Sequence, residues 1–369
     1  MEDNTYELKA GSPKNAGLNS NILQRATDLL QSEIEARRIT AASLLVARQG
    51  TVALSQGFGH LTPDKESSPV EPDSIFLLAS ITKPVTACAL MLLVDQGQVS
   101  LNDPVSLYIP EFQGGNRSQI LVRHLLSHTS GLPDMLPQNI ALRRAHAPLS
   151  AFVEGAIQTP LRYVPNTDFA YQSKGILLAA EIVERISGER LRDFEAREIF
   201  TPLNMHKSAL GLGSFQISET VWCGTTLEET EDQQRFGPNS PYWRDQGHPW
   251  GGMHSTAPDL AILLQTILNR GIYNNKRLFS RACVDAMISN QNPYLPAPWG
   301  LGWALGRSIV WSYFGDLVSP AAFGHTGATG TVAWADPKHQ LICVILTNQM
   351  VDSGSLLRRV SNLVSASVQ

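Results

Sequence analysis

The chain has 369 residues, a formal charge of −4 and an apolar fraction of 43%, which predicts a globular protein with a sizeable core. The weak acidic excess argues against a nucleic-acid surface, and apolar stretches such as 87–94 are far shorter than the roughly 20 residues of a membrane span. Four cysteines without a CxxC pair predict no structural disulfide. The N-terminal residues lack the basic start and apolar stretch of a secretory signal, so a cytoplasmic location is expected unless this end has been trimmed.

The predicted elements place strands near both ends of the chain and helices between them. Apolar residues recur at helical spacing over 19–38, and two apolar runs around Gln49-Gly50 predict a β-hairpin. The middle of the chain, about 75–290, is predicted to be mainly helical, with the clearest helices at 80–97, 174–187 and 259–270. Three further strands are expected within 299–311, 327–337 and 340–349, followed by a closing helix over 353–368.

This order predicts an α+β fold with one antiparallel sheet built from both chain ends. We expect a single catalytic unit spanning 1–369. Its sheet subdomain would comprise approximately 1–75 plus 290–369, and its inserted helical subdomain approximately 76–289. A cleft between the two is the expected place for a site.

The first chemical motif is Ser80-Ile-Thr-Lys83 at a predicted helix start. Residues three apart on a helix face the same side, so the lysine lies beside the serine. A serine hydroxyl needs a nearby base, and desolvation disfavours the charged form of a lysine. Taken alone, the pattern also fits a serine N-cap followed by a solvated lysine.

Two further motifs follow in the chain. In Tyr171-Gln-Ser173, two side chains spaced two apart point the same way if the backbone is extended, and a tyrosine can act as a general base. The alternative is a partly buried tyrosine bonded to a backbone carbonyl. The segment 323–334 contains His325-Thr-Gly327, where closely spaced glycines allow a ligand to lie against a strand, or simply soften a hairpin.

The three motifs in the order S-x-x-K, Y-x-S and H-x-G resemble those of the β-lactamase and D-alanyl-D-alanine-peptidase-like serine hydrolases, in particular the class C-like branch that includes carboxylesterases. Segments 103–112, 121–134, 251–261 and 300–303 look like the same family, so the resemblance covers roughly 20–350. It implies that Ser80 is the acylated nucleophile and that Lys83 and Tyr171 share the proton transfers, with the acylation base left open between them. It also implies an oxyanion hole formed by the backbone N–H groups of Ser80 and Ala328.

Two departures from the family pattern affect the expected substrate. Ser173 replaces the asparagine that often ends the tyrosine motif, which weakens the case for recognising a β-lactam or peptide amide. His325 replaces the lysine that begins the third motif of class C β-lactamases, so a permanent charge becomes one that titrates. Together with Gly327, these residues are the candidate substrate-binding positions. Both departures disfavour an efficient β-lactamase.

Other patterns carry weaker hypotheses. His124 and His128 are four apart, but the HExxH pattern fails and structural histidines are expected, with no metal and no cofactor. No GxSxG elbow occurs, and His254 is expected to bond the backbone. The long segment 213–250 contains or adjoins tryptophans that either bind an acyl chain or hold the segment to the body, namely Trp222, Trp243 and Trp250.

The sequence therefore favours a carboxylesterase on short- or medium-chain esters, with a small-molecule ester or amide as its partner and no nucleic acid. A D-aminoacyl peptidase or weak β-lactamase using the same residues is the alternative. An acyltransferase to an alcohol acceptor and a non-catalytic binding relative are the remaining hypotheses. The oligomeric state does not follow from the sequence.

Overall fold

The molecule is built on a seven-stranded sheet that joins the two ends of the chain. The computed structural model describes residues 5–224, 231–306 and 308–369. The strand order is β1-β3-β2-β12-β11-β10-β9. The bounds are β1 (Lys9–Ala10), β2 (Ala41–Arg48), β3 (Thr51–Gly59), β9 (Ala304–Leu305), β10 (Phe323–Gly327), β11 (Thr331–Asp336) and β12 (Leu341–Thr347). The predicted antiparallel pairing is confirmed for every neighbouring pair from β3 to β9, and β1 adds a two-residue parallel edge to β3.

The antiparallel pairing of β2 with β12 joins the strands from the two chain ends into one sheet, and in its register Leu45 lies opposite Val344. The predicted hairpin around Gln49-Gly50 is confirmed, and both residues have positive φ angles, +51° and +75°. This conformation is typical of two-residue turns whose twist matches that of the flanking strands.

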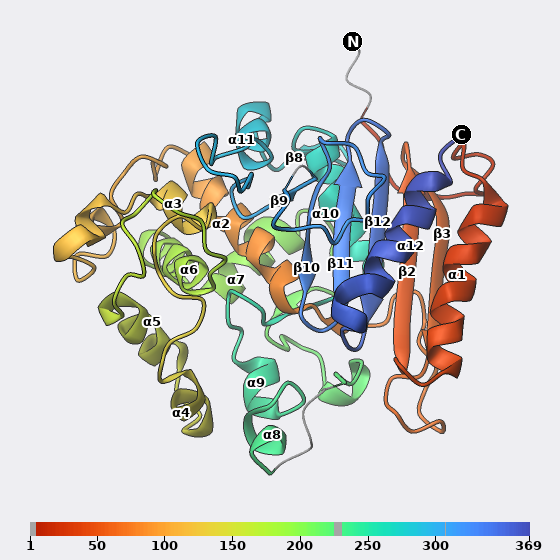
Figure 1. Cartoon of the computed structure of the whole chain (residues 1–369), viewed down its shortest axis with the longest axis horizontal. Helices are drawn as coiled ribbons and strands as arrows, with labels where there is room; N and C mark the ends of the chain where they lie inside the picture. Colours follow the sequence, from red (N-terminus) through yellow and green to blue (C-terminus); the bar gives the residue numbers. More distant parts are fainter. Residues whose placement is uncertain (1–4, 225–230, 307) are drawn as a thin grey trace.

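Helices cover both faces of this sheet (Figure 1). Leu44 and Val46 pack in a core with α1 (Ser20–Glu35) and α12 (Ser355–Ala366), whereas Leu45 and Ala47 belong to the core on the opposite face. On that opposite face lies α10 (Ala257–Leu268), which contacts β2, β11 and β12. Successive residues of a strand point to opposite faces, so one apolar run serves two cores.

The helical part is centred on α2 (Thr82–Asp95), which is buried almost all round and packs against α6 (Lys174–Ser187) and α7 (Leu191–Glu195). The remaining helices are α3 (Val122–Leu126), α4 (Asn139–Arg144), α5 (Leu149–Gln158), α8 (Glu231–Phe236), α9 (Pro241–Asp245) and α11 (Arg281–Met287). The division into a sheet and a helical subdomain at 75 and 290 stays a prediction.

The sequence prediction missed a small sheet inside this helical part. Its order is β4 (Phe76–Leu77), β6 (Met253–Ser255) and β5 (Ala209–Leu210), and a separate hairpin pairs β7 (Ile272–Tyr273) with β8 (Lys276–Arg277). These strands have two or three residues each, too few for a periodicity of two to be recognised. The pairing of β4 with β6 matters for function because it fixes the chain just before Ser80.

The strand expected within 299–311 is present but short, because among the described residues of this range Ala304–Leu305 alone form a strand of the sheet. Gly302 has a φ of +79°, and a Cβ there would lie 2.3 Å from the Cβ of Ala87. The backbone therefore turns to pass close to α2 instead of continuing along the sheet.

Part of the segment 213–250 is ordered around a buried arginine. Arg244 on α9 donates to the carbonyls of Val221 and Pro238 and to Thr220 Oγ1. Trp243 and Trp250 are buried, which favours the interpretation that tryptophans hold the segment to the body. Residues 225–230 of this segment lie outside the described residues.

Neither disulfides nor membrane-spanning helices are predicted from the sequence. All four cysteines are free thiols, as expected. In the described part of the chain, none of the helices combines the length and the apolar character that crossing a membrane requires.

Candidate active site

Ser80 lies between β4 of the small sheet and α2, in a turn that contacts β10. Figure 1 shows α2 running toward β10. The helix prediction began at Ser80, but a short 3₁₀ turn, Ala79–Ile81, precedes the α-helix, which begins at Thr82. Thr82 Oγ1 donates to the Ala79 carbonyl at 2.7 Å and accepts from the Met253 N–H at 3.0 Å. These bonds fix the turn that presents the serine.

Ala79 adopts a left-handed backbone conformation, with φ of +50°. This region disfavours residues that have a Cβ, by roughly 1–2 kcal/mol. Such strain persists only where the surroundings enforce it, and it is frequent beside reacting groups. The strained residue immediately precedes Ser80.

Lys83 is directed at Ser80, as the spacing predicted. Its Nζ lies 2.9 Å from Ser80 Oγ and donates to the Trp250 carbonyl oxygen at 2.9 Å. The side chain is 1% exposed. Burial lowers the pKa of Lys83 to about 7, with Asp134 opposing this shift and Lys174 adding to it. A large fraction of this amine is therefore uncharged near neutral pH.

Tyr171 lies next to Lys83, whose Nζ is 4.8 Å from the centroid of the phenol ring. Its ring stacks on Trp311 at 4.8 Å and contacts His128 at 4.7 Å. The hydroxyl is buried without a hydrogen-bond partner among the described residues. Burial raises the pKa of Tyr171, and the nearby Ser80 hydroxyl offsets only part of this rise, so the phenol is neutral at pH 7.

Ser173 does not end up as a free hydroxyl in the cleft. It is buried, and its Oγ donates to Asp134 Oδ1 at 2.7 Å. Asp134 itself is half-buried. The hydroxyl thus fixes the orientation of a carboxylate.

The end of β10 brings the third motif against the turn that carries Ser80. A Cβ on Gly327 would lie 2.0 Å from the Leu78 carbonyl oxygen, so only glycine permits this approach. Thr329 and Thr331 donate to the carbonyls of Leu77 and Leu78 at 2.9 and 2.8 Å. Ala328 follows Gly327 at this junction and is exposed.

His325 is fully buried and neutral. Its Nδ1–H donates to the Thr326 carbonyl at 2.7 Å, and its ring packs among Tyr171, Trp299 and Trp311. Burial lowers its pKa to about 3, and the nearby Lys83 lowers it further. This position therefore supplies no cation at neutral pH.

The sequence and the fold can now be compared with those of known proteins. The family model described as Beta-lactamase matches residues 26–365. The chain belongs to the Beta-lactamase family. The members of this family are serine hydrolases, and so are the structural neighbours of the chain, which agrees with the resemblance drawn from the three motifs.

Individual relatives within this family carry different names. A Salmonella typhimurium protein named "Putative D-alanyl-D-alanine carboxypeptidase" is 30% identical over 376 residues, covering 93% of this chain and 86% of that protein. A family VIII carboxylesterase has a TM-score of 0.76 at 20% identity, covering 94% and 99% of the two chains. The hydrolase EstCE1, described as having promiscuous acyltransferase activity, has a TM-score of 0.75 at 20% identity, covering 93% and 98%. The two structures show the shared fold.

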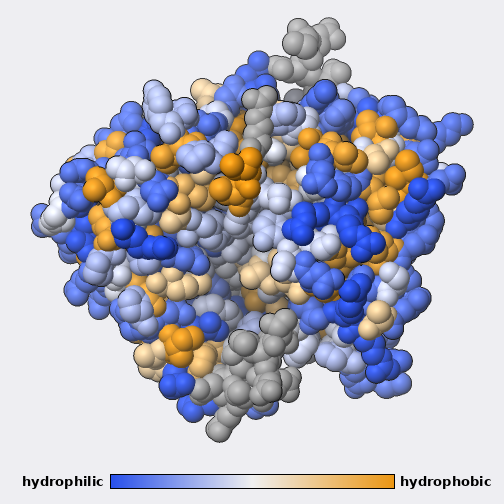
Figure 2. All heavy atoms as spheres, in the orientation of Figure 1, coloured by the Kyte–Doolittle hydropathy of each residue, from blue (hydrophilic) through white to orange (hydrophobic). Residues whose placement is uncertain are grey.

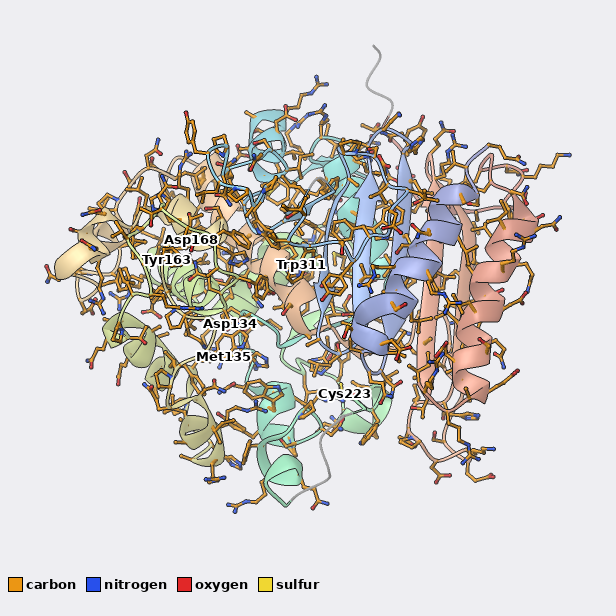
Figure 3. The ribbon with its side chains drawn as sticks, viewed as in Figure 1. Asp134, Met135, Tyr163, Asp168, Cys223 and Trp311 are labelled. Atoms are coloured by element: carbon orange, nitrogen blue, oxygen red, sulfur yellow. The ribbon has the colours of Figure 1, made fainter. Side chains whose placement is uncertain are left out.

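A hollow opens between the sheet and the helical part, as expected for the Beta-lactamase family (Figure 2). In Figure 3, Asp134, Met135 and Tyr163 lie on its helical side and Trp311 on its sheet side. Apolar side chains gather on its upper rim in Figure 2. Exposed apolar residues accompany Trp311 in sequence, namely Ile309, Val310 and Leu317.

Several residues of this neighbourhood were missed by the sequence prediction. Asp134, Trp299 and Trp311 lie far from the three motifs in sequence, and Lys174 was treated only as part of a helix. The only available signal was that Asp134 ends the family-like segment 121–134. Their arrival at the site depends on tertiary packing.

The two histidines of the segment 121–134 are structural, as predicted. His124 Nδ1 accepts from the Leu121 N–H, and His128 Nδ1 accepts from the Gln172 N–H. His254 Nδ1 bonds the Gly211 carbonyl, which confirms its predicted backbone bonding. Among the residues that the structure describes, no cluster of three His, Cys, Asp or Glu side chains could hold a metal ion.

Gly327→Ala tests the close approach of β10 to the turn at Ser80. We expect kcat to fall roughly 10-fold or more, because the added methyl would push the 327–328 backbone away from Ser80. Steady-state kinetics and thermal unfolding would be measured together. Gly97→Ala is the control, since Gly97 faces open space; its positive φ, +73°, adds backbone strain without a contact. Equal kcat in both variants would contradict this account.

Proposed function

We propose that this serine hydrolase is a carboxylesterase that acts on neutral short- or medium-chain esters through an acyl-enzyme on Ser80. The observation that carries the proposal is the environment of His325. Where a carboxylate-binding cation is expected in class C β-lactamases, this chain has a buried, neutral imidazole. Half-buried Asp134 would further repel a substrate carboxylate.

In the acylation step, Ser80 Oγ attacks the ester carbonyl and passes its proton to Lys83 Nζ, 2.9 Å away. The N–H groups of Ser80 and Ala328 would stabilise the oxyanion, which is the usual means of lowering this barrier. The ester C–O bond then breaks. The leaving alkoxide takes the proton of the neutral Tyr171 phenol and departs as the alcohol.

In the deacylation step, the Tyr171 phenolate lies beside the protonated Lys83, which stabilises it. The phenolate takes a proton from water, and the resulting hydroxide attacks the acyl carbon. The bond to Ser80 breaks, and Lys83 returns its proton to the serine oxygen. All groups are then in their starting protonation states, and the net products are a carboxylic acid and an alcohol.

The test is a comparison of kcat/KM on p-nitrophenyl butyrate, a D-alanyl-D-alanine peptide and nitrocefin. The proposal expects the ester to exceed both others by roughly 100-fold or more, because neither the neutral His325 nor Asp134 attracts a substrate carboxylate. Adding an alcohol acceptor to the ester assay separates hydrolysis from acyl transfer. A peptide preference would overturn the ester proposal and favour the D-aminoacyl peptidase, to which the Salmonella relative's name points.

The pH dependence follows from the state of Lys83. Only its uncharged amine can accept the serine proton, so kcat/KM for the ester is expected to rise with pH through a midpoint near 7. His325 is not expected to contribute, since its pKa lies at about 3. A profile from pH 5 to 9 measures this, and a rate that is flat across 6–8 would contradict Lys83 as the base.

A further inference from the structure

A second buried lysine lies close to the first. Lys174 is 0% exposed, and its Nζ has no hydrogen-bond partner among the described residues. It lies 3.7 Å from the centroid of the Trp250 ring, while the backbone carbonyl of the same tryptophan accepts from Lys83. Trp250 therefore contacts both amines, one through its ring and the other through its backbone.

The charged partner of this cluster is Asp134. It is fixed by Ser173, the residue immediately before Lys174. The Asp134 charge favours the charged form of both lysines, and Lys174 disfavours charging of Lys83. Two buried amines beside a single carboxylate are expected to share one proton over a range of pH.

Arg143, with a pKa lowered to about 10 mainly by burial, stays charged at neutral pH and acts on His248, whereas the other titratable groups around the cluster carry no charge. Burial lowers the pKa of the surrounding histidines and raises those of Tyr171 and Glu195, the latter to about 8. The histidines are His124 and His128 around α3, His248 before β6 and His325 on β10. The charges that act on Lys83 itself are thus those of Asp134 and Lys174.

We propose that Lys174 and Asp134 are opposed positioning residues that together decide whether Lys83 carries the proton of this cluster. Lys174 holds the proton in the resting enzyme, because its ammonium lies on an indole, the aromatic ring that stabilises cations best. Lys83 bonds Ser80 Oγ and the Trp250 carbonyl, and the aromatic ring that it faces is a phenol, at the longer distance of 4.8 Å. Lys83 therefore stays a free amine next to Ser80. Neither Lys174 nor Asp134 takes part in a bond-forming step.

This inference rests on the proposed function for its consequence, the pH at which Ser80 is acylated. Lys174→Met keeps an unbranched chain on Trp250. We expect this variant to raise the pH midpoint of kcat/KM by about one unit, because a positive charge near Lys83 is lost. Asp134→Asn is expected to lower this pH midpoint by a similar amount. Lys174→Arg keeps the charge, so its pH midpoint is expected to lie within about 0.3 unit of the wild-type value.

Lys276→Met is the matched control, since Lys276 is exposed on β8 and its loss removes one charge outside the Lys83–Lys174 cluster. If Lys174 had only a structural role, Lys174→Met would lower stability or kcat without moving the pH midpoint. Lys174→Met and Asp134→Asn would then not shift the midpoint in opposite directions. Should Lys174→Met fail to fold, Asp134→Asn and Lys174→Arg still test the sign and the requirement for charge.

The titration of Lys83 can also be followed without turnover, by NMR of ¹³C-lysine-labelled protein with its signal assigned from Lys83→Met. A Lys83 midpoint that rises in Lys174→Met and falls in Asp134→Asn is the expected result. A midpoint unchanged in both folded variants overturns the inference. Failure of the proposed function is a different observation, namely a preference for the peptide over the ester, or ester turnover that survives Ser80→Ala.

Discussion

Ser80→Ala is expected to lower kcat for p-nitrophenyl butyrate by roughly 10⁴-fold or more, because removal of a nucleophile leaves only binding and oxyanion stabilisation. The serine is half-buried, beside a free amine and after a strained residue. Its loss removes one oxygen atom, so the fold and the thermal unfolding temperature are expected to stay close to those of the wild type.

Intact mass spectrometry with a fluorophosphonate ester gives a second readout of the same variant. The wild type is expected to gain one covalent adduct and Ser80→Ala none. Ser118→Ala is the matched control, since Ser118 is an exposed serine in the 3₁₀ turn Gly115–Gln119, outside the three motifs. Labelling that persists in Ser80→Ala would show that another residue is the nucleophile.

Lys83→Met is expected to lower kcat by roughly 10³-fold, the scale of a lost general base. Methionine keeps an unbranched chain in the same buried space, so the loss is chemical more than steric. Lys83→Arg is expected to be similarly inactive, because a guanidinium stays charged at any accessible pH and cannot accept the serine proton.

The two Lys83 variants are distinguished from a folding defect by circular dichroism and by retained binding of an unreactive ester analogue. Their residual activity is expected to lose the pH midpoint near 7 seen for the wild type. An active Lys83→Met enzyme with that midpoint intact would assign the acylation base to another residue, with Tyr171 as the remaining candidate.

The family and the general fold could be predicted from local patterns. Ser80 and Lys83 are three residues apart, and a helical turn brings such a pair together without help from the rest of the chain. The hairpin at Gln49-Gly50 and the helix that begins at Lys174 follow equally from short-range preferences and from regular spacing of apolar residues. The motif order then pointed to the Beta-lactamase family.

The tertiary structure decided what local patterns do not encode. Burial makes Lys83 a base, Tyr171 a neutral phenol and His325 an uncharged ring, and burial depends on packing of distant segments. The two-residue strands β4 and β5 form only because β6 lies between them. Lys174 meets Trp250, and Ser173 meets Asp134, through packing of segments that are distant in the chain, and no spacing in the sequence predicts these contacts. The sequence by itself thus determined which groups the enzyme has, and only the packed structure decided which of them are charged.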